Sequence, residues 1–283
     1  MSVTNFIPEI WNATLLASLK KELVFAAPGV VNRNFEGSIA QAGDTVRITS
    51  VGRPTIGTYV ANTTTITPET LTTGQRTLTI DQAKFFAFEV DDIDKRQVAG
   101  DVMAEAMIEA AFALRDVADQ YVAALYTQVQ SANQLGTVAV PAATPAVAYD
   151  SILVPLKVRL DEANVPSQGR WCIVPPWMHG RLLRDDRFVR VDASGTGEAL
   201  RNGIVGRAAG FDILMSNNAP LVTGDDHAVL AGVPAAITYA EQIASTEAYR
   251  PESSFADAVK GLHLYGAKMI RPEAAASAIA SQT

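Results

Sequence analysis

Histidine, cysteine and closely spaced carboxylates are the side chains of this chain that could do chemistry. His179, His227 and His263 lie far apart in the sequence, and none has the spacing of metal ligands. Cys172 is the single cysteine, so an intrachain disulfide is excluded. It falls within the apolar run of residues 171–174, which predicts a buried strand in which the thiol acts as a small core side chain.

Asp91, Asp92 and Asp94 form the one tight carboxylate cluster that could suggest a metal site. They directly precede a long helical pattern. Acidic side chains are favourable at the positive end of a helix, and one of them can cap its first turn. The sequence therefore favours a helix start over a metal site.

Glycine-rich and nucleophile motifs give no catalytic assignment. The chain has no P-loop, no dinucleotide fingerprint, no His-Glu-x-x-His and no Gly-x-Ser-x-Gly elbow. No catalytic, cofactor-binding or metal-ligating residue is assigned. A serine–histidine or carboxylate-pair site could still assemble in three dimensions, so an enzyme resembling the α/β hydrolases stays open as an alternative.

Composition restricts the partners of this chain. It has 283 residues, a formal net charge of −7 and only 19% charged residues. An acidic chain does not bind nucleic acid through a general electrostatic footprint. A surface with few charges fits a protein that buries much of it against partners, or simply an Ala-rich soluble protein. We see no signal-peptide pattern and no apolar run of about 20 residues, so we expect synthesis in a cytoplasm and no membrane span.

Residues 94–130 are rich in helix formers and predict one very long helix. Its apolar side chains recur every three or four residues and so share one face. At about 1.5 Å per residue the helix would be roughly 50 Å long. Such a helix suits a strut between subunits better than an enzyme core. The predicted stripe is Met103, Met107, Ala110, Leu114, Val117, Tyr121 and Leu125.

Residues 36–92, ahead of this helix, predict β structure. Polar and apolar side chains alternate over residues 45–49, 77–80 and 86–90. Folded once, the segment could form a ribbon up to about 60 Å long at ~3.3 Å per residue. A two-stranded ribbon is marginal alone in water, so we expect another surface to order it.

Residues 1–35 predict an arm with one short amphipathic helix. Trp11, Leu15, Leu19 and Leu23 recur every four residues. A single short helix cannot bury its apolar stripe by itself. The arm must therefore dock on the body or on a neighbouring subunit.

The second half of the chain has an α/β pattern. The Ala-rich tail after Pro272 is expected to be weakly helical or frayed. The predicted helices cover residues 150–163 and 177–184, and the predicted strands cover residues 171–174, 211–215, 228–230, 236–239 and 259–271.

The order of these elements resembles the major capsid proteins of tailed bacteriophages. The closest resemblance is to the coat proteins of short-tailed phages, without their large inserted domain. No single phrase is diagnostic, but the ordered set covers essentially the whole chain. The phrases that carry the resemblance are residues 43–48 and 88–94, residues 174–176 with 182–183, residues 206–220, and residues 264–272.

The resemblance implies an α+β fold of the tailed-phage capsid type. Its parts would be an N-terminal arm at 1–35, an extended β-hairpin loop at 36–92, a peripheral β-domain with a long spine helix at 93–150 and 241–283, and a central axial α/β domain at 151–240. Many copies, as hexamers and pentamers, would tile an icosahedral shell around phage double-stranded DNA without sequence-specific binding. A scaffolding protein and a portal would be partners, and the shell would be assembled in the bacterial host cytoplasm. An encapsulin-type shell is the alternative of similar architecture.

Candidate subunit-interface residues come from the arm and from the exposed middle of the loop. Relatives that weld their subunits form an isopeptide bond from a lysine on this loop. Residues 37–90 contain one lysine, Lys84, near the base of the loop, so we predict a non-covalent shell in which arginines meet carboxylates of neighbours. The interface candidates are Trp11, Leu15, Leu19, Arg53, Glu69 and Arg76.

Overall fold

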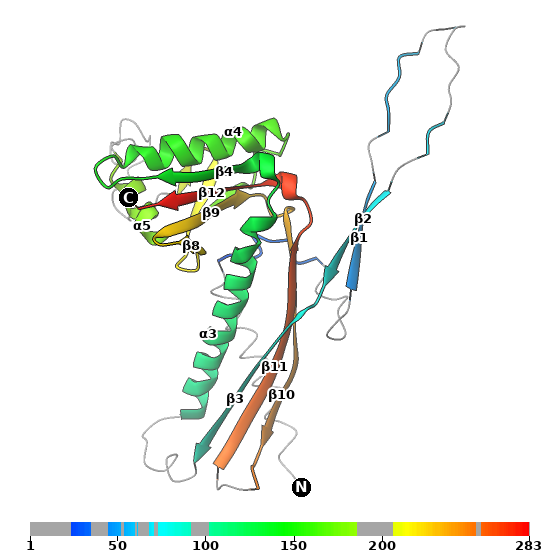
Figure 1. Ribbon diagram of the computed structural model, residues 1–283. Helices are drawn as coiled ribbons and strands as arrows, with labels where there is room; N and C mark the ends of the chain where they lie inside the picture. Colours follow the sequence, from blue (N-terminus) through cyan, green and yellow to red (C-terminus); the bar gives the residue numbers. More distant parts are fainter. Residues whose placement is uncertain are drawn as a thin grey trace.

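The computed structural model describes residues 24–34, 45–51, 54–59, 61, 68–70, 73–91, 102–185, 206–252 and 256–282. Strands β1 (Thr45–Val51) and β2 (Thr73–Thr79) pair antiparallel as a two-stranded hairpin. Figure 1 shows this hairpin projecting away from the rest of the subunit. The alternation over residues 45–49 and 77–80 is thus confirmed as strand.

A three-stranded antiparallel sheet forms the elongated part of the subunit. Its order is β10 (Ile237–Tyr249), β11 (Ala256–Met269) and β3 (Gln82–Asp91). Helix α3 (Val102–Ala123) runs beside these strands (Figure 1). Met103, Met107, Ala111 and Leu114 of the helix pack on Val259 of β11 and on the half-buried Phe86 and Phe88 of β3. Alternation along β3 therefore directs its even-numbered side chains toward the helix.

The predicted long helix is corrected in its extent and in its buried face. The α-helix ends at Ala123, and a 3-10 segment (Ala124–Gln128) replaces the predicted continuation to Gln130. Residues 92–101, where the predicted helix begins, lie outside the described residues. Val117 was placed in the buried stripe but is 39% exposed, and the neighbouring Ala118 and Asp119 are buried in its place. Leu125, the last residue of the predicted stripe, is buried as predicted.

The compact part of the subunit is a seven-stranded mixed sheet. Its order is β4-β12-β9-β5-β7-β6, with β8 paired to β9. Its helices are η5 (Ala148–Leu153), a π-helical turn that leads into α4 (Val154–Glu162), and α5 (Pro176–Leu183). The strands are β4 (Gln134–Ala139), β5 (Trp171–Val174), β6 (Arg207–Ala208), β7 (Phe211–Met215), β8 (Leu221–Thr223), β9 (Asp226–Gly232) and β12 (Ala275–Ser281).

The Ala-rich tail was predicted to be weakly helical or frayed. This prediction is wrong, because residues 275–281 form strand β12. A short 3-10 segment (Pro272–Ala274) leads into it, and it then lies between β4, to which it is parallel, and β9, to which it is antiparallel. Its side chains are buried or half-buried along the whole strand. The sheet therefore unites β4 and β12 with the segment that the sequence analysis assigned to the axial domain; the domain boundaries themselves stay a prediction.

Candidate assembly surfaces

The outer part of the hairpin, residues 54–59 (called the tip below), exposes apolar side chains far from any core of this subunit. Ile56 is 95% exposed and Tyr59 is 66% exposed. The Thr55 backbone N–H donates a 2.6 Å hydrogen bond to Glu69 Oε1, which ties the two limbs of the hairpin together. This hydrogen bond lowers the pKa of Glu69. Exposed apolar side chains on a projecting ribbon make this surface a candidate for contact with another chain.

Two of the six interface candidates fall within the described residues, both on the hairpin. Glu69 is exposed, but its carboxylate accepts a hydrogen bond from Thr55 within the same hairpin. Arg76 is exposed on β2, opposite Ile48 in the register. The remaining four, Trp11, Leu15, Leu19 and Arg53, lie outside the described residues.

Part of the second face of the three-stranded sheet, on the side opposite α3, is open to solvent. Phe85 is 77% exposed there. Lys260 and Glu247 form a 2.9 Å ion pair beside it, and the Lys260 ammonium also lies over the Tyr249 ring. A shallow groove follows Phe85, Ala87, Glu247, Lys260 and Leu262. The sequence analysis missed this surface, although the alternation that sends Phe86 and Phe88 inward also sends Phe85 outward.

A buried carboxylate joins three distant segments at the end of α3 nearer the compact sheet. Asp119 Oδ1 accepts hydrogen bonds from the backbone N–H groups of Val24, Phe25 and Ala26, at 3.0, 2.7 and 3.3 Å. Its Oδ2 accepts a 3.0 Å hydrogen bond from the Asn218 side chain. Burial raises the pKa of Asp119, and these hydrogen bonds partly oppose the rise. Asp119 thus ties the segment 24–34 and the loop after β7 to the helix.

A second buried network lies where the segment 24–34 meets the three-stranded sheet. Glu241 accepts hydrogen bonds from Arg33 at 2.6 Å and from the Tyr239 hydroxyl at 2.8 Å. His263 Nε2 lies 3.4 Å from the same carboxylate. Burial acts to raise the pKa of Glu241, but His263, Arg33 and Tyr239 together outweigh it and lower this pKa to about 2. The carboxylate is therefore held in its charged form.

The side chains that could do chemistry are separated by the fold. His179 lies on α5, His227 contacts Trp177, and His263 belongs to the Glu241 network. Cys172 is fully buried, as predicted, and burial raises the pKa of its thiol. Among the described residues no group of three or more His, Cys, Asp or Glu side chains is arranged to hold a metal ion. Asp92 and Asp94 lie outside those residues.

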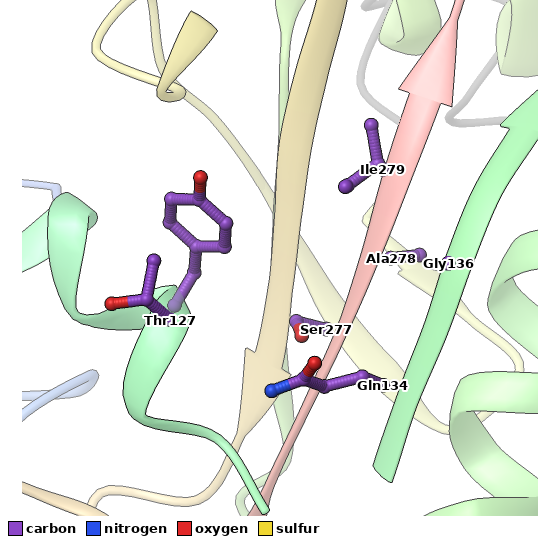
Figure 2. A pocket seen from close by; sticks show the side chains of 7 residues that line it. Thr127, Gln134, Gly136, Ser277, Ala278 and Ile279 are labelled. Atoms are coloured by element: carbon purple, nitrogen blue, oxygen red, sulfur yellow. The ribbon is translucent and has the colours of Figure 1, made fainter. Parts of the chain in front are cut away.

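One small hollow, of about 190 Å³, opens between the 3-10 segment after α3 and the edge of the seven-stranded sheet. Figure 2 shows Thr127, Gln134, Ser277 and Ile279 around it. The Gln134 amide already donates a 2.7 Å hydrogen bond to the Val129 carbonyl. Its lining offers hydroxyl, amide and aliphatic groups but no carboxylate, imidazole or thiol, so it does not have the make-up of a catalytic pocket.

The fold and these surfaces define a class of protein: an elongated structural subunit with a projecting hairpin and with apolar side chains exposed on its surface. Within the described residues, no helix has the length and apolar character needed to cross a membrane. A family model described as phage capsid protein matches residues 72–278. The chain belongs to this family and is a structural major capsid protein. No curated protein matches it.

Solved structures agree with the family. A structure of Mycobacterium phage Che8 is 33% identical, covers 92% of this chain and 91% of its own, and superposes with a TM-score of 0.74. The capsid of Cyanophage P-SCSP1u is 18% identical, with coverage of 93% and 90% and a TM-score of 0.71. A virus-like particle from Pyrococcus furiosus shares the fold at 15% identity, with coverage of 95% and 98% and a TM-score of 0.60. The predicted tailed-phage capsid fold is confirmed, and the phage capsid is favoured over the encapsulin-type shell.

Proposed function

We propose that hexamers and pentamers of this chain tile an icosahedral shell that encloses phage double-stranded DNA, with the hairpin of each subunit lying on a neighbour. A scaffolding protein and a portal are the proposed assembly partners, and the host cytoplasm is the proposed site of assembly. The acidic chain would enclose DNA without specific contacts. No catalytic step is part of this proposal.

The observation that carries the proposal is the exposure of Ile56 and Tyr59 at the hairpin tip. Covering an apolar side chain of this size is worth roughly 1.5–3 kcal/mol, and a shell repeats the contact in every subunit. Arg53 and Arg76 are proposed to meet carboxylates of the neighbour at the rim of this contact, worth about 0–1 kcal/mol each. Trp11, Leu15 and Leu19 are proposed as further subunit contacts of the arm.

Replacing both tip side chains tests the proposal directly. We expect the double variant Ile56→Ser, Tyr59→Ser to fold with the thermal stability of the parent, because neither side chain is buried within the subunit. Shell formation with scaffold, followed by electron microscopy, should be lost. Thr58→Ser at the same tip is the matched control and should assemble normally. Normal shells from the double variant would contradict the proposed hairpin contact.

A further inference from the structure

The base of the hairpin crosses directly over a glycine of the three-stranded sheet. A Cβ atom placed on Gly266 of β11 would lie 2.4 Å from the Thr79 carbonyl oxygen and 3.0 Å from the Ile80 Cα atom. Both neighbours are backbone, so neither can rotate away as a side chain could. The residue paired with Gly266 on β10 is Ala240, which is also small. The sheet therefore offers a flat site made of two small residues, Gly266 and Ala240, where the chain passes from β2 to β3.

Polar and apolar contacts hold the crossing chain on both sides of this site. Leu78 and Ile80 are buried against Leu264 and Ala240. Lys268, two residues beyond Gly266 on the same face of β11, donates a 2.9 Å hydrogen bond to the Thr77 carbonyl. These contacts hold the end of β2 against the three-stranded sheet.

The corner after the crossing is tied to the spine helix α3. The Tyr121 hydroxyl donates a 3.0 Å hydrogen bond to Asp81, at the turn into β3. Burial and this carboxylate raise the pKa of Tyr121 to about 12, so the phenol stays protonated and remains a donor. The hairpin thus has a fixed corner at Asp81. Two residues earlier in the chain, the backbone at Thr79 lies on Gly266.

This arrangement works as a lever. A methyl group at Gly266 would have to push the Thr79 oxygen from 2.4 Å to beyond 3.0 Å. Thr73, at the far end of β2, is eight residues from the corner at Asp81, whereas Thr79 is two residues from it. For a stiff ribbon at ~3.3 Å per residue the movement grows about fourfold, to roughly 2–3 Å at Thr73 and more at the tip.

We propose that Gly266 is a positioning residue that sets the direction in which the hairpin leaves the subunit, and through it the curvature of the shell. The inference rests on the proposed function, because curvature follows only if the hairpin lies on a neighbour. The tip must meet the same surface in every copy, so a change of direction by a few ångströms alters how neighbouring subunits tilt. Glycine is required here for space, since it is the one residue without a Cβ.

Spin labels on the unassembled subunit measure the direction without assembly. Thr58→Cys at the tip and Ala113→Cys on α3 are both exposed, and the native Cys172 is fully buried and leaves the labelling clean. Adding Gly266→Ala should shift the distance between the labels by several ångströms. An unchanged distance in folded protein would overturn the proposal.

Gly261→Ala is the matched control on the same strand. There a Cβ would meet the ring of Phe86 at 2.3 Å, on the face toward α3, and a ring edge can move where backbone cannot. We expect this variant to lose thermal stability without moving the label distance, and its shells to keep the parent diameter. In contrast, electron microscopy of Gly266→Ala shells should show loss of the parent diameter or irregular particles. Shells of parent diameter from a variant with a moved hairpin would refute the curvature step.

Tyr121→Phe provides a second variant that removes one hydroxyl and leaves the ring in place. Loss of the tie to Asp81 should broaden the distribution of label distances, and an unchanged width would argue against the corner as a fixed point. If the parent chain forms no shells with scaffold, the proposed function fails, while the label distances still decide whether Gly266 directs the hairpin.

Discussion

At the scale of single residues, Glu241 is the clearest stabilising charge of the subunit. Its pKa lies at about 2, below the ordinary 4.5, so its contribution is present above pH 4.5 and is lost as the pH falls toward 2. A lowering of this size corresponds to about 3 kcal/mol. We expect Glu241→Gln to destabilise the subunit by roughly that amount at pH 7 in urea unfolding, and the difference from the parent to shrink between pH 4.5 and pH 2.

Glu247→Gln is the matched control for this measurement. Glu247 pairs with Lys260 at 2.9 Å, but both side chains are more than half exposed. Solvent screening limits such a pair to about 0–1 kcal/mol. A Glu241→Gln variant no less stable than Glu247→Gln at pH 7 would contradict the role given to the buried carboxylate.

Asp119 acts through geometry rather than through its charge. Because burial raises its pKa, the folded subunit binds the carboxyl proton more tightly than the unfolded chain does, and this contribution to stability is present at low pH and lost as the pH rises through the raised pKa. Asp119→Ala orphans three backbone N–H groups at about 1–3 kcal/mol each, so we expect a loss of at least ~2 kcal/mol. Asp119→Asn keeps an acceptor, and a flipped Asn218 amide can pair with it, so it should cost clearly less. Equal losses in denaturant unfolding would rule out this account.

At the scale of elements, helix α3 gives a test that separates sequence pattern from packing. Leu114 is 6% exposed and packs with Val259 and Phe88, whereas Val117 is 39% exposed. Leu114→Asp places a charge in that contact without a partner, and we expect a loss of more than about 3 kcal/mol or insoluble protein. Val117→Asp should cost under about 1 kcal/mol in the same thermal unfolding assay. Equal losses of stability in the two variants would instead support the predicted stripe, which places both residues on the buried face.

Alternation and periodicity predicted most elements, because strands with one buried face and amphipathic helices leave a direct pattern. Val117 was wrongly placed on the buried face of α3 because the helix packs on two partners. Its first half faces Val259 and Val90, and its second half enters the larger core through Ala118 and Val122. Alanine carries little hydrophobic signal, so Ala118 was passed over in favour of Val117.

Strand β12 and the buried junctions could not be found in the sequence for a related reason. Alanine is the strongest helix former, and a strand buried on both faces has no alternation to reveal it. Only pairing with β4 and β9 makes residues 275–281 a strand. The same holds for Asp119, whose partners at Val24 and Asn218 are about a hundred residues away in the chain. Of the interface candidates, the hairpin position of Glu69 and Arg76 was foreseeable, but the Thr55 contact of Glu69 was not.

At the scale of the whole molecule, the shell is predicted to be held without covalent bonds between subunits. Lys84 lies on β3, an edge strand of the three-stranded sheet, where it pairs with His263 of the central strand β11, away from the hairpin tip. It is half-buried, so a neighbour's side chain reaches it poorly. Shells boiled in denaturing detergent should run as one band near 30.1 kDa on a gel. A ladder of multimers, abolished by Lys84→Arg, would disprove this.

The place of β12 in the sheet also bears on when a subunit can begin to assemble. β12 lies between β4 and β9, yet residues 275–281 leave the ribosome after every other strand of that sheet. Until then the facing edges of β4 and β9 have no partner, and the nascent chain cannot close its core. A polysome carrying many growing copies of a shell protein holds them at high local concentration, where premature association would trap misfolded chains. Because β12 follows every other strand of this sheet in the chain, the core of the subunit closes only once this strand has been inserted between β4 and β9.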